Sequence, residues 1–354
     1  MAQVIFLRTP FLIEVNEASQ IQTKVEIKLR KVGDAFPTSP QYTLSKYIPS
    51  SNKPNTVYNI SPYVQEFITN KIPTRTFTNT DLPTDEYCEV AITSYYNTGS
   101  GWLTADTYQF YAFNGYTPYE DGKQAESSVL FLNDIATRWY YKSEPTYRPQ
   151  VNVFCESGAV SDALKTARYH DLTGVASYVD VDLTALDGWK LIPAVYALFT
   201  DCKLELIDVT DTIIETIYSY SVEECKYTPY RVDYVNKLGV WDQMHFYKAS
   251  NESVKVSSKN YNLLQSDYDY DATDGTKKVY NKMGNKSVKV NSGWVDEVVK
   301  QQIEELMMSE RILLSGKPVM LKTESTELYN HLNNKQINYQ LEFEYSNEVM
   351  SNVI

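Results

Sequence analysis

The sequence predicts a mainly β protein: tandem β-sandwich-like domains followed by a C-terminal α+β domain, in which an amphipathic helix packs on an antiparallel sheet. Short segments with alternating apolar and polar residues recur along the chain, as is typical of half-buried strands. Tyrosine, which favours pleated and interfacial surfaces, occurs 30 times in 354 residues. This length exceeds the roughly 250–300 residues of a single core, so we expect domains at 1–126, 127–228 and 229–354.

The first domain is predicted to be a β-sandwich-like module with one helical insertion. Strands are expected at 25–29, where apolar and charged residues alternate, and on both sides of a Gly-Ser loop, at 87–96 and 107–113. Within the segment NISPYVQEFI, Ser61 is a favourable N-cap and Pro62 a favourable first helical residue. A turn is expected at 52–55, and the polar segment 116–126 is the expected linker.

The second domain is predicted from short strands at regular spacing, as in a second small sandwich. Its candidate strands are rich in β-branched and aromatic residues and lie at 129–132, 150–154, 175–181, 203–207 and 212–220. The segment 157–169 is compatible with a helix or a long loop, and the pattern does not choose between them.

The third domain is predicted to begin with a β-hairpin within residues 225–248. Tyr230, Val232 and Tyr234 alternate with polar residues, and an Asn-Lys-Leu-Gly turn precedes a second alternating run. Apolar residues at helical spacing predict an amphipathic helix near 295–309, with Asp296 and Glu297 in its first turn. A hairpin beginning at 312 and a last alternating strand at 337–345 complete the domain.

Charge and cysteine content narrow the classes of function. The net charge is −12 and the pI is near 4.9. No Lys/Arg cluster large enough to neutralise a run of phosphates is apparent, which argues against wrapping of nucleic acid. The acidic charge has two interpretations: an ordinary solvated surface, or the acidic wall of a passage for DNA. Four widely spaced cysteines, without a CxxC motif, indicate reduced, buried thiols of a protein made in a cytosol.

No membrane segment is predicted. The N-terminal sequence MAQVIFLRTPFLIEV has no long apolar region, and no apolar run approaches the ~20 residues that cross a bilayer. We therefore expect neither a signal peptide nor a membrane-spanning helix.

The acidic segment DYDYD is the one candidate for a calcium loop. Asp267, Asp269 and Asp271, with Asp274 nearby, begin as a calcium-binding loop does. An EF-hand also requires glycine at the sixth position and glutamate at the twelfth, where this chain has Ala272 and Lys278. A solvated acidic loop is therefore the preferred interpretation, and no metal site is predicted.

The three histidines give no zinc site either. His170, His245 and His331 lie in separate segments, and none has a neighbouring histidine or cysteine at zinc-ligand spacing.

No catalytic or cofactor-binding residues are predicted. The chain contains no GxSxG, GxxxxGK or GxGxxG motif. With 45 acidic residues, some pair of carboxylates lies within reach in any fold, so composition alone does not indicate a glycosidase. We expect a protein that is not an enzyme and binds no cofactor.

Aromatic residues beside the Gly-Ser loop suggest a possible contact surface. These residues are Trp102, Tyr95, Tyr96, Tyr108 and Tyr111. Their placement is compatible with a sugar-stacking platform, a contact between subunits, or ordinary core packing, because aromatic side chains are enriched in all three.

Several stretches together resemble virion structural proteins of tailed phages of Bacteroidetes hosts, in particular the tail and neck ring proteins of crAss-like phages. The stretches span nearly the whole chain: NISPYVQEFI at 59–68, YAFNGY at 111–116 with EDG at 120–122, ECKYTP at 224–229 leading into VDYVNKLGVW at 232–241, VNSGWV at 290–295, and INYQLEFEY at 337–345. They are structural signatures and contain no catalytic motif.

The resemblance implies a subunit of a closed ring, dodecameric in that family, stacked below the portal in the tail or neck of the virion. Its partners would be further copies of itself, the portal, and other ring and tail proteins. DNA would be only a passing cargo in the ejection channel, without sequence-specific binding. The protein would be made in the host bacterial cytoplasm and would contact no membrane.

Two other functions stay open at this stage. One is a tail-associated module that binds host surface glycan through exposed aromatic side chains near Trp102. The other is a depolymerase, which requires two facing carboxylates in a cleft.

Overall fold

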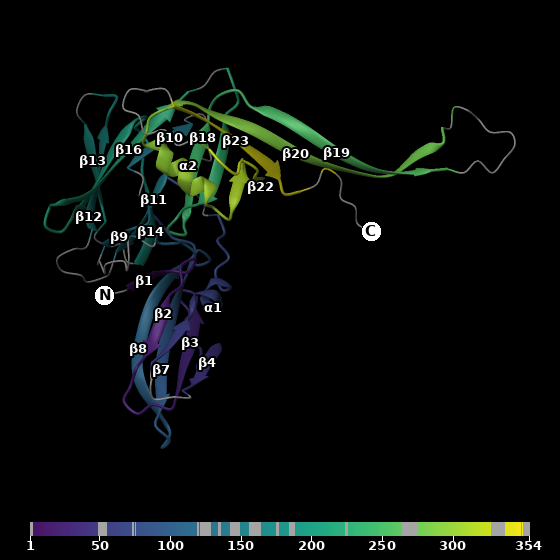
Figure 1. Cartoon of the computed structure of the whole chain (residues 1–354). Helices are drawn as coiled ribbons and strands as arrows, with labels where there is room; N and C mark the ends of the chain where they lie inside the picture. Colours follow the sequence, from purple (N-terminus) through teal and green to yellow (C-terminus); the bar gives the residue numbers. More distant parts are fainter. Residues whose placement is uncertain are drawn as a thin grey trace. The chain divides into compact units, whose positions relative to one another are not determined.

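The computed structural model describes most of the chain (Figure 1). The described residues are 3–48, 55–72, 74, 76–118, 120, 129–133, 136–141, 149–155, 164–174, 177–183, 188–223, 226–263, 273, 275–326, 337–347 and 349. Strands account for 56% of the structure and helices for 6%, which confirms the mainly β class.

The chain divides into two compact units. Unit 1 consists of Met1–Glu223 and Val235–Asp242, and unit 2 consists of Glu224–Tyr234 and Gln243–Ile354. The first predicted domain and residues 127–223 of the second lie in unit 1, where each has a core of its own. Their sheets are not fully separate, because Thr80–Asp81 of the first pairs with Gly188–Pro193 of the second. The tip of the predicted hairpin belongs to unit 1, although most of its two strands belongs to unit 2.

Two sheets share the first core of unit 1. The larger sheet has the order β1-β8-β7-β3-β4, formed by Gln3–Phe6, Trp102–Phe113, Tyr87–Asn97, Gln22–Arg30 and Tyr42–Tyr47. The smaller sheet pairs β2 (Leu12–Val15) with β5 (Thr56–Asn59). Side chains of both sheets and of α1 (Ser61–Gln65) form one apolar cluster. Strand β3 alternates between buried and partly buried residues, so the predicted amphipathic strand is confirmed.

Two further sheets build the second half of unit 1. A five-stranded sheet has the order β10-β16-β15-β12-β13, formed by Thr137–Tyr141, Ile213–Val222, Cys202–Asp208, Leu164–Asp171 and Tyr178–Asp182. A four-stranded sheet has the order β6-β14-β11-β9, formed by Thr80–Asp81, Gly188–Pro193, Gln150–Cys155 and Val129–Phe131. The segment left open at 157–169 is a strand from Leu164 onward, and its earlier residues lie outside the described chain.

An aromatic core lies within unit 1, between elements of both halves. The Trp189 ring lies 4.6 Å from the Phe113 ring and 4.7 Å from the Phe154 ring, measured between ring centroids. Tyr87 and Tyr111 contact the same cluster. The two halves are therefore joined by large buried side chains, and most of the predicted linker at 116–126 lies outside the described residues.

Unit 2 is built on one seven-stranded sheet. Its order is β18-β17-β21-β22-β23-β20-β19, formed by Trp241–Phe246, Tyr230–Val235, Ile312–Leu314, Lys317–Leu321, Ile337–Tyr345, Lys277–Val295 and Asn251–Asn262. Helix α2 (Val299–Met307) buries Val299, Ile303 and Leu306. Strand β23 alternates between buried and partly exposed residues, so the last predicted strand is confirmed, as is the hairpin β21–β22.

Both helices are shorter than predicted, and neither has the predicted start. Ser61 is the first helical residue of α1 rather than its N-cap, and its Oγ donates to Thr9 O and accepts from Phe11 N. The second helix begins at Val299 instead of 295, because β20 continues through the predicted start to Val295. A register shift between Asn291 and Trp294 accommodates the Ser-Gly pair within that strand.

The predicted hairpin at 225–248 forms, but its strands are not half-buried. All six residues of β18 are buried, including Asp242, Gln243 and His245. Alternation of apolar and polar residues predicts that one face of each strand is exposed to solvent. This prediction is wrong for β18, whose two faces are both buried. Polar side chains are tolerated inside because they find partners: the Gln243 amide donates to Asp233, whose carboxylate also accepts from Arg231 Nε at 3.0 Å.

Cys88 and Cys202 are thiols shielded from solvent and from reagents. Cys88 and Cys202 are completely buried, and burial raises the pKa of Cys88 to about 12 and that of Cys202 to about 11. Because the thiolate is the nucleophile, we expect neither to react with a disulfide reagent in the folded protein at about pH 8. Peptide-level mass spectrometry should show modification of both only after unfolding in urea. Rapid labelling of either in the folded protein would contradict this expectation.

Candidate functional site

The longest exposed element is a two-stranded ribbon of unit 2, formed by residues 251–262 of β19 and 277–289 of β20. The strands pair antiparallel from Asn251 opposite Lys289 to Asn262 opposite Lys277. Strand β23 covers β20 only from Ser287 onward. The ten residues 277–286 therefore extend past the third strand, over roughly 33 Å at ~3.3 Å per residue, and the ribbon projects from its sheet (Figure 1).

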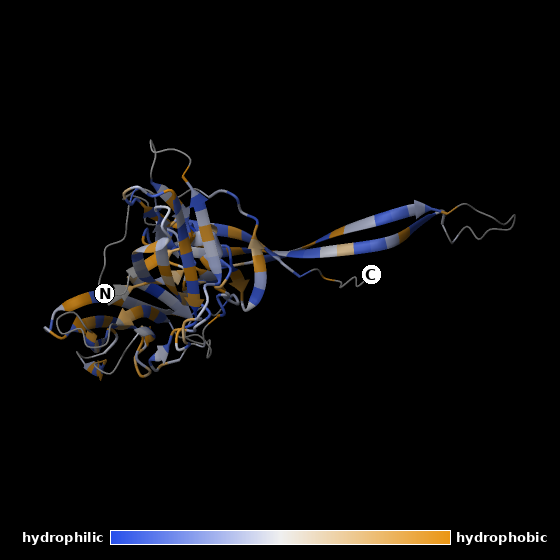
Figure 2. Cartoon of the chain, turned by 90° about the horizontal axis from the view of Figure 1, so that it is seen from below, coloured by the Kyte–Doolittle hydropathy of each residue, from blue (hydrophilic) through white to orange (hydrophobic). Residues whose placement is uncertain are grey.

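Strand β19 of the ribbon is exposed along its whole length, and β20 is mostly exposed or partly exposed up to Gly284. Every residue of β19 is exposed, and Figure 2 shows mainly hydrophilic residues with separate apolar bands along the two strands. A two-stranded ribbon without a core is marginally stable in water, so the ribbon gains little from the rest of its own chain.

Lysine dominates the charge of the ribbon. It carries seven lysines and a single acidic residue, Glu252; the lysines are Lys255, Lys259, Lys277, Lys278, Lys282, Lys286 and Lys289. Five of them have no ion-pair partner among the described residues: Lys259, Lys277, Lys282, Lys286 and Lys289. The pairing of β19 with β20 places lysines that are distant in the sequence along one ribbon, a grouping that the sequence alone did not reveal.

The register divides the ribbon into two faces. Residues opposite each other in an antiparallel pair point to the same face, so Val254, Val256 and Val279 share one face with Lys282 and Lys286. The three valines are 55%, 61% and 49% exposed. This face combines apolar and cationic side chains, a combination suited to a protein surface with acidic and apolar groups.

A cavity of about 390 Å³ lies at the base of the ribbon. Its wall includes Glu252, Lys286, Lys317 and Tyr345. Tyr230 Oη donates to Glu252 Oε1 at 3.0 Å, and burial, followed by this hydrogen bond, raises the pKa of Tyr230. The wall thus carries two ammonium groups and one carboxylate, a net positive charge that favours an anionic group.

The residues weighed as metal ligands do not come together in the described part of the chain. His170 Nε2 lies 2.9 Å from Glu205 Oε2, and His245 is buried in unit 2 with its ring stacked on Tyr247. His331 lies outside the described residues, as do all four aspartates of the acidic loop at 267–274. Among the described residues, no three His, Cys, Asp or Glu side chains are grouped closely enough to hold a metal ion.

The aromatic residues beside the Gly-Ser loop do not form a single open platform. Tyr111 packs against the aromatic core, and Tyr108 stacks on Phe110. Trp102 is 39% exposed, but Lys24 Nζ lies 5.1 Å from the centroid of its ring and 4.4 Å from that of Tyr95. The ammonium group thus makes a cation–π contact with both rings.

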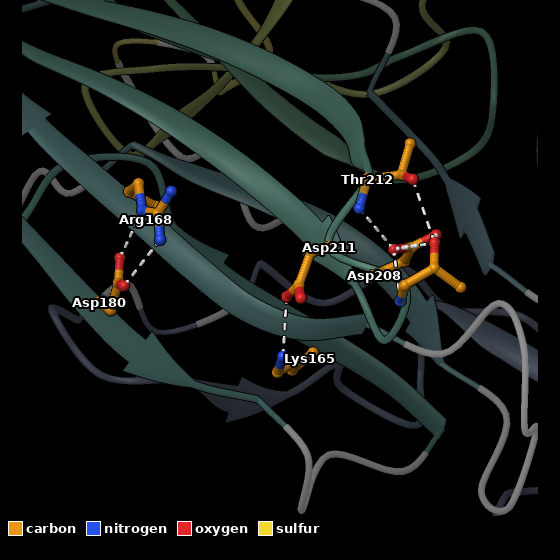
Figure 3. Close-up of polar contacts among 7 residues, drawn as sticks. Lys165, Arg168, Asp180, Asp208, Asp211 and Thr212 are labelled. Carbon is orange, nitrogen blue, oxygen red and sulfur yellow. Dashed lines mark hydrogen bonds and ion pairs between the residues drawn. The ribbon is translucent and has the colours of Figure 1, made fainter.

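Another group of polar side chains lies on the sheet that contains β12, β13, β15 and β16 (Figure 3). Arg168 binds both carboxylate oxygens of Asp180, at 2.8 and 3.0 Å, across neighbouring strands. Asp208 Oδ1 accepts the backbone N–H groups of Thr210 and Thr212, each at 2.8 Å, and the hydrogen bond from Thr212 is the main reason that its pKa is lowered. These contacts close a β-hairpin and link strands, which is a structural role.

Neither described helix has the length or the apolar run of a membrane span.

Of the features of unit 2, the ribbon has the clearest signature of a binding element: great length, a high density of lysine and exposed valines. Sequence analysis missed it because both faces are wet, so the strands lack the apolar periodicity by which strands are recognised. The alternation of Val254, Lys255 and Val256 was the available signal.

Comparisons with known proteins do not assign this chain to a family. No protein-family model matches the chain, and no curated protein matches it.

Proposed function

We propose that the chain is a non-enzymatic structural protein of a tailed-bacteriophage virion, a subunit of a ring in the tail or neck. In this role it assembles with copies of itself below the portal, around the channel through which DNA leaves. The resemblance of seven separated stretches to ring proteins of crAss-like phages supplies the class of protein, and the exposed ribbon supplies a means of assembly.

The ribbon is the observation that carries the proposal. Fixing the backbone of one residue costs about 1–2 kcal/mol of conformational entropy, and the 12 exposed residues of β19 return little of it by burial. Subunits of large assemblies use such extended elements because a neighbouring protein completes the burial.

The remaining architecture is compatible with this role. We propose that unit 1 consists of two sandwich-like modules in tandem and that unit 2 is an α+β domain, which gives the subunit several surfaces for unlike neighbours. A closed ring requires such heterologous contacts, in which one face meets a different face of the next copy. The acidic remainder of the chain would repel DNA from the channel wall.

Glycan binding is the weaker candidate. Its support was the aromatic group near Trp102. Two members of that group, Tyr111 and Tyr108, instead pack against other rings of the protein. The cation of Lys24 lies over the two rings that would have to stack on a sugar. A tail-associated sugar module thus has no assembled platform to act through.

We expect negative-stain electron microscopy of the purified protein, alone and mixed with the portal and neighbouring tail proteins of its phage, to show closed rings. Ring images would also give the copy number. Light scattering coupled to size exclusion measures the same assembly in solution. Monomers in both samples, together with binding in a glycan screen, would contradict the ring and support the alternative.

A further inference from the structure

We infer that the ribbon of one copy docks on the surface around α2 of a second copy of this chain. The inference rests on the proposed function, since it assigns the contact that holds neighbouring subunits together. The α2 surface is defined here by Trp294, Asp296, Glu297, Val298, Glu304 and Met308, all of which are exposed.

The α2 surface offers the apolar half of the match. Trp294 is 64% exposed, Val298 is 53% exposed and Met308 is 51% exposed. Large apolar side chains gathered in one short segment are typical of surfaces that another protein covers. The ribbon presents Val254 and Val256 at similar exposure, so both partners gain by burying apolar area.

The α2 surface also offers the charge that the ribbon lacks. The carboxylates of Asp296, Glu297 and Glu304 have no ion-pair partner among the described residues. Glu304 and Met308 are four residues apart and lie on one side of the helix. The mixture of acidic and apolar groups complements the mixture of lysine and valine on the ribbon, and complementary charge selects the partner and its orientation.

A second copy is the occupant that the charge distribution favours. Outside residues 251–289 the chain keeps 26 of its 33 Lys and Arg but 40 of its 45 Asp and Glu, a net charge of −14. Each copy therefore carries a cationic ribbon and an anionic remainder, which attract between molecules. DNA also attracts lysine, but phosphates offer nothing to the exposed valines that share a face with Lys282 and Lys286.

The contact is heterologous, because the ribbon and the α2 surface are different patches. Repetition of a heterologous contact produces a ring when the rotation closes and an open filament when it does not. The reach of the ribbon, roughly 33 Å beyond the third strand at ~3.3 Å per residue, is sufficient to cross to an adjacent subunit.

Charge reversal tests the contact. In conditions where the wild-type protein assembles, we expect the triple variant Lys277→Glu, Lys282→Glu and Lys286→Glu, three lysines on the face that holds the valines, to assemble only at a protein concentration at least about tenfold higher. The variant Asp296→Lys, Glu297→Lys and Glu304→Lys should show the same loss. Combining all six substitutions restores opposite charges on the two surfaces and should recover assembly. Light scattering and electron microscopy measure all three.

A matched control separates the site from net charge. Lys28→Glu, Lys46→Glu and Lys71→Glu change the charge equally on residues outside the ribbon and should leave assembly within about twofold of wild type. All substituted ribbon side chains are exposed, so circular dichroism should show unchanged folding. A photo-cross-linking residue at position 256 should form bonds to residues 294–308 of another molecule, identified with mixed isotope-labelled copies.

The outcomes separate this inference from the proposed function. Rings that form equally well with the ribbon variant, or cross-links that avoid 294–308, would overturn the docking and leave the ring intact. A ribbon variant that assembles normally but loses retention on duplex DNA would also overturn it, in favour of nucleic acid as the occupant. A wild-type protein that stays monomeric with all its virion neighbours would overturn both.

Discussion

Replacement of Asp242 by alanine is expected to destabilise unit 1 by about 3–5 kcal/mol, because it removes one partner of a buried ion pair with Arg138. Asp242 Oδ1 accepts from Arg138 Nη1 at 2.6 Å, and Oδ2 accepts from Arg138 Nη2 at 3.2 Å and Asn133 Nδ2 at 3.1 Å. The Arg138 and Asp242 side chains are only 3% and 1% exposed. Urea denaturation followed by circular dichroism measures the loss.

The exposed pair Arg168–Asp180 is the matched control. It is also bidentate, through Nε and Nη2 of Arg168 instead of the two Nη atoms, but its side chains are 35% and 40% exposed. Asp180→Ala should cost less than about 1 kcal/mol, as is typical of surface pairs. The double variant Arg138→Met with Asp242→Leu should be more stable than Asp242→Ala, because it removes the guanidinium together with the carboxylate that binds it. Equal losses for Asp242→Ala and Asp180→Ala would show that Asp242 has no special role.

Substitution of Gly239 by alanine is expected to cost about 3 kcal/mol or more through two separate effects. Its φ of +88° strains any side-chain-bearing residue by about 1–2 kcal/mol. An added Cβ would also lie 2.6 Å from Gly115 N and 2.7 Å from Asn114 C, both backbone atoms that cannot turn away. The tip of the hairpin would have to leave its place in unit 1. The free energy of unfolding measures the change.

Two other glycines separate the effects. Gly33 has a φ of +92° and open space around the position of a Cβ, so Gly33→Ala should show only the backbone strain of about 1–2 kcal/mol. Gly115 has no positive φ, but its added Cβ would lie 2.5 Å from Leu238 C. We expect Gly115→Ala to be intermediate and Gly239→Ala to be the most damaging. A Gly239→Ala variant no worse than Gly33→Ala would show that the tip yields easily.

The sequence was sufficient to predict those strands that have one buried and one exposed face. Strand β23 was predicted with its bounds because its residues alternate, and β3 was predicted for the same reason. It was also sufficient for the turn of β17–β18, since Asn and Gly tolerate the tight reversal. In these cases the information lies within about ten neighbouring residues.

The sequence was insufficient where burial depends on distant residues. Asp242 looks like a surface residue, and only the fold brings Arg138 against it from 104 positions away. The start of α2 was misplaced because Asp296 and Glu297 suit a first helical turn, but pairing of β20 with β23 extends the strand to Val295. The lysines of the ribbon formed no recognisable group until the register of β19 and β20 brought them together.

The assignment of the hairpin tip to unit 1 has a consequence for biosynthesis. The Asn236 side chain donates to Leu132 O at 2.9 Å, and Trp241 Nε1 donates to Asn70 O at 3.2 Å, so the tip completes a structure whose other parts end at Glu223. A ribosome adds about 5–20 residues per second, so the nascent first unit waits roughly 1–4 seconds for residues 224–242. During that interval its aromatic core lacks Val240, and the chaperones of the cell meet an unfinished surface.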